Sequence, residues 1–163
     1  MANQNSEDIH SSMNLEKLGL SLKEVASDYI QSEVADVVSR WLHSSLDVDL
    51  FFWVDERSQI IKQQLTFCGQ VIEWDYIDGL KTGFIVDEDS KDRSSMKASG
   101  SELIHFDSQV QWVTVNQGLK VIDSTPALSD KEKQSLISNF TKKDKSSMSA
   151  LVRAVKNWVK SKK

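Results

Sequence analysis

The chain has 163 residues, of which 39% are hydrophobic and 27% charged, and its net charge is −4. This length can bury a core without disulfides or metal ions, and this composition excludes a largely disordered protein. A single cysteine, Cys68, excludes an intramolecular disulfide. No apolar run is long enough to cross a bilayer, and the polar N-terminus is unlike a signal peptide, so we expect a cytoplasmic protein.

Residues 1–13 have no apolar periodicity, and we expect a disordered tail followed by a single α+β domain over residues 14–163. The first predicted element is a long amphipathic helix from Ser21 to about Ser44. Its start is indicated by a capping box, Ser21-Leu22-Lys23-Glu24. Apolar residues then recur at helical spacing, namely Leu22, Val25, Ala26, Tyr29, Ile30, Val34, Val37, Val38, Trp41 and Leu42. A stripe this broad can cover one face of a sheet.

The apolar period then changes from 3.6 to 2, which is typical of strands. The predicted strands are 48–54, 60–68, 71–77 and 80–86. Between the last two, Asp78-Gly79 favours a two-residue type I′ hairpin that pairs Trp74 with Gly83. The predicted fold is therefore α+β, with the long N-terminal helix packed on an antiparallel meander of about 4–7 strands.

The segment after the meander is less uniform. Residues 88–102 are polar and rich in serine, so we expect a flexible surface loop. Residues 103–106 fit a strand. Residues 108–123 fit either a hairpin around Asn116-Gln117-Gly118 or a helix, in which Gly118 would cost about 1 kcal/mol. The β-branched residues favour the hairpin.

The chain is predicted to end in helices. Ser129 fits the N-cap of one helix, and a second begins near Ser146. Charge is divided unevenly: residues 1–141 hold 12 Lys/Arg against 23 Asp/Glu, or −11, whereas residues 142–163 hold 8 against 1, or +7. We expect 142–163 to be a basic amphipathic helix that docks either on its own acidic body or on a partner. The candidate partner-binding residues are Arg153, Lys156, Trp158 and Lys160.

Motifs for catalysis are absent from the sequence. The histidines are not in metal-ligand spacing, and no phosphate-binding glycine loop or GxSxG motif occurs, so we expect no metal and no cofactor. Cys68 has no neighbour in sequence that would lower its pKa. In a meander, Asp55, Glu56 and Asp78 would share one rim of the sheet, which leaves a small carboxylate-based enzyme as a weaker hypothesis.

These observations favour a non-catalytic protein-binding module, such as an adaptor, chaperone or regulatory protein, with a homodimer as one expected form. It would act through the sheet face, the long helix or the C-terminal helix, and its five tryptophans fit binding hot spots or a core. The alternative is binding of nucleic acid or an anionic membrane through the basic helix, although the acidic body would repel a polyanion. In size, acidity and a leading helix before an antiparallel sheet, the chain is similar to small secretion chaperones, a likeness of class without a shared motif.

Overall fold

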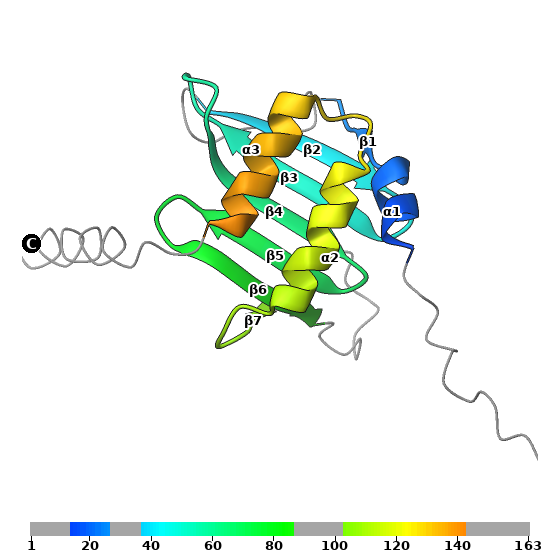
Figure 1. The fold of residues 1–163 in the computed structure, drawn as a ribbon, viewed down its shortest axis with the longest axis vertical. Helices are drawn as coiled ribbons and strands as arrows, with labels where there is room; N and C mark the ends of the chain where they lie inside the picture. Colours follow the sequence, from blue (N-terminus) through cyan, green and yellow to red (C-terminus); the bar gives the residue numbers. More distant parts are fainter. Residues whose placement is uncertain (1–13, 27–36, 87–102, 143–163) are drawn as a thin grey trace, which may run out of the picture.

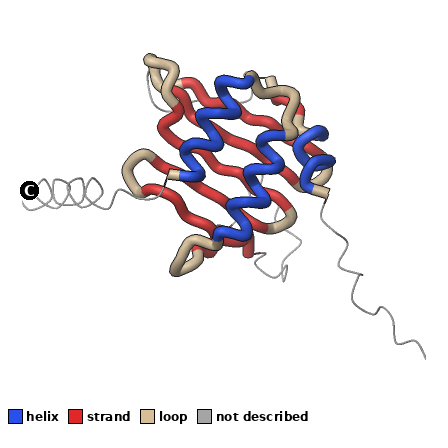
Figure 2. The backbone as a smooth tube through the Cα atoms, in the orientation of Figure 1, coloured by secondary structure: helices blue, strands red, loops and turns tan. Residues whose placement is uncertain are grey.

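The computed structural model describes residues 14–26, 37–86 and 103–142, and within them the fold is α+β. The elements are, in chain order, α1 (Leu15–Ser21), β1 (Lys23–Glu24), β2 (Val38–Ser44), β3 (Val48–Val54), β4 (Ile60–Phe67), β5 (Gln70–Asp75), β6 (Gly79–Val86), β7 (Leu103–Phe106), α2 (Trp112–Asp123) and α3 (Asp130–Thr141). The strands form one antiparallel sheet in the order β1 to β7. Helices α2 and α3 cross one face of this sheet, and α1 lies beside α2 (Figure 1). Figure 2, which colours helices and strands separately, also shows α2 and α3 on the same side of the sheet.

The predicted helix from Ser21 to about Ser44 is wrong wherever the structure describes it. Ser21 does not cap a helix start; it is the last residue of α1, and its hydroxyl donates to the carbonyl of Leu18. Lys23 and Glu24 form β1. At the other end Val38–Ser44 is β2, while residues 27–36 lie outside the described ranges.

The reason for this error lies in the composition of β2. Its residues satisfy a period of two as well as one of 3.6: Leu42 and Ser44 are buried while His43 between them is exposed. Each residue of β2 pairs with one of β3, from Val38 with Val54 to Ser44 with Val48. Cross-strand pairing of this kind overrides a helical pattern that depends on spacing alone.

The predicted strands after residue 48 are confirmed as β3 to β6, and the strand at 103–106 as β7. The turn at Asp78-Gly79 differs from the prediction. Asp75 pairs with Gly79, so three residues form the loop, and Trp74 faces Leu80 instead of Gly83. The carboxylate of Asp75, at the end of β5, accepts hydrogen bonds from the backbone amides of Ile77 and Asp78 at 2.7 and 3.2 Å. These bonds hold the loop in its three-residue form.

The two-residue turn with positive φ occurs one hairpin earlier. Phe67 pairs with Gln70, which leaves Cys68 and Gly69 as the loop between β4 and β5. Their φ angles are 49° and 75°, as a type I′ turn requires. Cys68 therefore occupies a left-handed position that usually favours glycine or asparagine.

The segment predicted as a hairpin at 108–123 contains helix α2, so the helical alternative is correct. Val115, Val121 and Ile122 of this helix are buried against the sheet. A Cβ atom at Gly118 would lie 2.3 Å from Cδ1 of Ile72 in β5. Gly118 lowers the helix propensity of this segment, but its missing side chain allows α2 to approach the sheet. The packing of α2 on the sheet outweighs the small loss of helix propensity.

Helix α3 is confirmed with its predicted cap. The hydroxyl of Ser129 accepts the amide of Glu132, and the carboxylate of Glu132 accepts the amide of Ser129. Under α3 the side chain of Gln63 is fully buried. Its amide donates to the carbonyl of Leu136 at 2.8 Å and its oxygen accepts from Asn139 at 2.9 Å, which fixes α3 on β4.

Three predictions fall on residues that the structure does not describe: the tail at 1–13, the loop at 88–102, and the basic helix at 142–163 apart from Lys142. The extent of the single domain predicted for 14–163 likewise stays a prediction. Across the described ranges, no helix combines the length and apolar character needed to span a membrane.

Candidate binding surface

The face of the sheet opposite α2 and α3, here called the open face, presents aromatic side chains from β2 and β3. Leu42, Leu50 and Phe52 are in the core on the helix-covered side. Because side chains alternate along a strand, their neighbours Trp41, Phe51 and Trp53 lie on the open face. These three rings are only partly buried.

The rings form a continuous row across the two strands. Trp41 and Phe51 are cross-strand partners, and their ring centroids lie 5.3 Å apart with 9° between the planes. Phe51 stacks on Trp53 at 6.2 Å, and Trp41 contacts the ring of His43 at 5.5 Å. We call Trp41, His43, Phe51 and Trp53 the aromatic row. Stacking restricts each ring to few orientations, which gives a pre-organised apolar surface.

Polar contacts hold both ends of the aromatic row. One carboxylate oxygen of Asp49 accepts the indole N–H of Trp41 at 2.7 Å and lies 2.8 Å from Nδ1 of His43. At the other end, Nζ of Lys62 lies 5.5 Å from the ring centroid of Trp53. The indole of Trp41 is therefore anchored by its hydrogen bond, and the face of Trp53 by a cation–π contact.

Two lysines on the described part of the open face are paired with carboxylates. Lys62 lies 3.6 Å from Glu73, and Lys81 lies 3.5 Å from Asp78. The described part of the open face thus combines apolar rings with charges of both signs. Such a surface differs from one built for polyphosphate, where cations are in excess.

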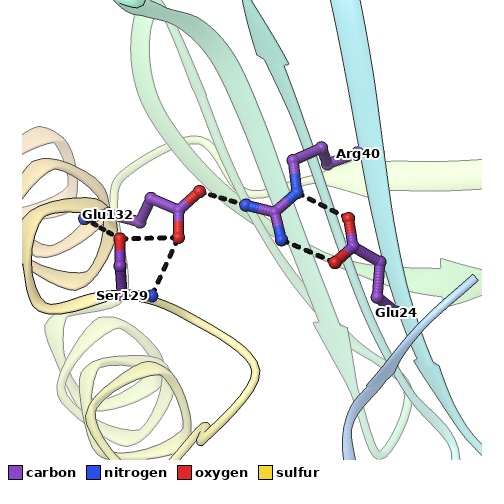
Figure 3. Close-up of polar contacts among 4 residues, drawn as sticks. All are labelled: Glu24, Arg40, Ser129 and Glu132. Carbon is purple, nitrogen blue, oxygen red and sulfur yellow. Dashed lines mark hydrogen bonds and ion pairs between the residues drawn. The ribbon is translucent and has the colours of Figure 1, made fainter.

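A second polar cluster lies at the corner where β1, β2 and α3 meet (Figure 3). Arg40 forms a two-pronged ion pair with Glu24, through Nε at 2.7 Å and Nη2 at 2.8 Å, and its third nitrogen donates to Glu132. The hydrogen bond from Arg40 lowers the pKa of Glu24, and the same bond raises the pKa of Arg40. Since Glu132 also caps α3, this cluster joins the helix start to the sheet edge and is structural.

The residues considered for catalysis do not converge in the part of the chain that is described. Burial, and next the charge of Asp47, raise the pKa of Cys68, which disfavours its thiolate. The carboxylate of Asp55 accepts the amides of Arg57 and Gln59 and so closes its own turn. Within residues 14–26, 37–86 and 103–142, no three potential metal ligands come together.

The predicted partner-binding residues Arg153, Lys156, Trp158 and Lys160 lie outside the described residues. The aromatic row is not evident from the sequence pattern, because Trp41 fits the apolar stripe of the predicted helix. The alternation of Phe51 and Trp53 with Leu50 and Phe52 was the signal that could have revealed it. We found no matching family model, no similar curated protein and no similar solved structure for this chain.

Proposed function

We propose that this chain is a non-catalytic protein-binding module whose recognition surface is the open face of the sheet. The observation that carries the proposal is the stacked aromatic row, which lies on the face that α2 and α3 do not cover (Figure 1). Tryptophan and other aromatic side chains dominate the binding energy of protein interfaces, because each offers a large apolar area with little side-chain entropy to lose.

The balanced charge of the open face indicates the chemistry of the partner. Stacked rings could also receive the bases of a single-stranded nucleic acid, but such sites add a cationic groove for the phosphates. Here Lys62 and Lys81 each lie within 4 Å of a carboxylate. The arrangement therefore favours a protein segment with apolar or aromatic anchors and few net charges over a polyanion.

The polar side chains beside the aromatic row also favour a protein partner. Asp49, Glu73 and Lys62 flank the aromatic row and carry hydrogen-bonding groups that a polar interface rim requires. An apolar centre inside a rim of paired charges is the usual anatomy of a protein–protein contact. Adaptor, chaperone and regulatory roles all use such a contact.

Affinity capture with the full chain tests the proposal. The double variant Trp41→Ala/Trp53→Ala should lower the yield of specifically captured protein at least tenfold, because it removes both ends of the row. Tyr76→Ala is the matched control, since Tyr76 is an exposed aromatic residue in the β5–β6 loop, away from the row. Circular dichroism of each variant confirms that the sheet is intact.

Two outcomes would contradict the proposal. Capture of the same proteins at the same yield by the folded double variant would show that the open face is not the binding surface. Binding that is lost only when residues 143–163 are deleted, and that falls steeply with salt, would instead assign recognition to the basic C-terminal segment and to a polyanion or anionic membrane.

A further inference from the structure

The two edges of the sheet are protected very differently. Edge strand β1 consists of Lys23 and Glu24, so it is short and charged, and Arg40 of β2 holds Glu24. Edge strand β7 is Leu-Ile-His-Phe, with no acidic or lysine side chain to oppose pairing. Short strands and charges are the usual protection against pairing with another chain, and β7 lacks the charge. Figure 1 shows these two strands at opposite ends of the sheet.

Exposed apolar side chains gather around β7. The exposed fraction is 56% for Leu103, 37% for Phe106 and 46% for Phe84 in the neighbouring strand. Trp112 and Val113, in the first turn of α2, are 46% and 72% exposed. That turn lies above β6, because the amide of Gln111 donates to the hydroxyl of Thr82 at 2.9 Å. We call Phe84, Leu103, Phe106, Trp112 and Val113 the edge patch.

The register of β7 on β6 determines which of its backbone groups point away from the sheet. The amide of Asp107 donates to the carbonyl of Thr82 at 2.8 Å, so these two residues form a hydrogen-bonded pair. Hydrogen-bonded and non-hydrogen-bonded pairs alternate along an antiparallel ladder. His105 and Leu103 therefore bond to β6, whereas the N–H and C=O groups of Ile104 and Phe106 point outward. No described strand pairs with that outer side.

We propose that β7 pairs antiparallel with β7 of a second copy of this chain, which joins the two sheets. The outward groups of Ile104 and Phe106 fix the register that uses the whole strand: Ile104 of each copy bonds to Phe106 of the other. Four backbone hydrogen bonds then cross the two-fold axis. His105 lies on that axis and faces His105 of the second copy.

The side chains suit this arrangement on both faces. Ile104 and Phe106 alternate onto the open face, and each would pack against the other residue of the second copy, Ile104 against Phe106, apolar against apolar. On the other face, His105 stacks on Phe84 with ring centroids 5.1 Å apart, beside Leu103. A second copy fits better than a charged partner, because β7 carries no Asp, Glu, Lys or Arg side chain to pair with a charge on a different chain.

The area of the edge patch is consistent with a dimer. At about 150–250 Å² per aromatic side chain, the exposed fractions of Phe84, Phe106 and Trp112 amount to roughly 200–300 Å² per copy. This is about a third to a half of the roughly 600 Å² per partner in the smaller stable interfaces. Leu103, Val113 and the paired backbone add to it.

A charge exchange at the axis tests both the dimer and its register. His105→Lys and His105→Glu each place like charges opposite one another, and each should weaken self-association at least tenfold in sedimentation velocity from about 1 to 100 µM. An equimolar mixture of the two variants should recover the dimer, because Lys then faces Glu. Lys23→Glu, on the opposite edge, is the control and should associate like the wild-type chain.

A second variant keeps the test decisive if the variants at position 105 fail to fold. Ile104→Pro removes an outward amide but keeps the hydrogen bonds of Leu103 and His105 to β6, and it should also be monomeric. A wild-type chain that stays monomeric over the whole series would overturn the proposal, as would variants at position 105 that dimerise normally. The inference is independent of the proposed function: Trp41→Ala/Trp53→Ala should remain dimeric.

Discussion

The covered face and the open face of the sheet are made by neighbouring residues of the same strands, yet they have different physical roles. On β3, Leu50 and Phe52 are fully buried under the helices, whereas Phe51 and Trp53 stack on the side that no described helix covers. On β4, Gln63 is buried beneath α3 while Gln64 faces outward. In these strands the alternation of side chains, and not the residue type, decides whether a residue stabilises the core or lies on the proposed recognition surface.

The largest expected difference between the two faces is at Phe52 and Phe51. Phe52→Ala should destabilise the protein by about 3–5 kcal/mol, because it leaves a cavity in a core position that is 1% exposed. Phe51→Ala removes two stacking contacts from the open face and should cost about 1 kcal/mol. Urea unfolding followed by circular dichroism measures both. Equal losses would contradict the assignment of the faces.

A smaller difference is expected at Gln63 and Gln64. Gln63→Leu removes the acceptor of the buried amide of Asn139 and should cost about 1–3 kcal/mol, even though leucine fits an apolar core. Gln64→Leu, on the open face, should change the free energy of unfolding by less than about 0.5 kcal/mol. The same urea series checks the pair, and a neutral Gln63→Leu would mean that the polar contacts to α3 contribute nothing.

The smallest expected effect concerns the polar corner beside the covered face. The pKa of Glu24 is lowered from its ordinary value of 4.5 by its bond to Arg40. Its contribution to stability is therefore fully present above that value and is lost as pH falls through the lowered pKa. With 47% of the side chain exposed, solvent screening limits the effect to under about 1 kcal/mol.

Comparison of wild type with Glu24→Gln between pH 7 and pH 3 measures this contribution. The variant should be less stable at neutral pH, and the difference should shrink on acidification, when the wild-type carboxylate is protonated. Glu56→Gln, in the exposed β3–β4 turn, is the control. A difference that grows at low pH would contradict the sign.

Local pattern was sufficient for much of the fold because several elements carry self-contained signals. The strands from β3 to β6 follow from alternation, and α3 follows from the reciprocal cap of Ser129 and Glu132. Pattern failed where one segment satisfied two periods. Residues 38–44 fit a helical stripe and a strand equally, and residues 112–123 fit a hairpin and a helix.

The turn geometry and the aromatic row could not be predicted from local sequence, because both depend on contacts with residues outside the local segment. A dipeptide such as Asp78-Gly79 indicates a turn, but the carboxylate of Asp75 chose a three-residue loop and thereby shifted the register. The aromatic row likewise depends on which strands pair with each other. Trp41 and Phe51 are ten residues apart in the chain and become stacked partners only through the pairing of β2 with β3.

By itself the sequence determined the α+β class, the strands that follow residue 48 and the capped helix α3, because apolar periodicity and capping act between near neighbours. Only the tertiary structure decided that 38–44 is a strand, that Gly118 belongs to a helix pressed against the sheet, and that no described helix covers the second sheet face and no described strand pairs with the outer side of β7. Those outcomes depend on which distant residues each segment meets, and burial against them outweighs a local preference of about 1 kcal/mol.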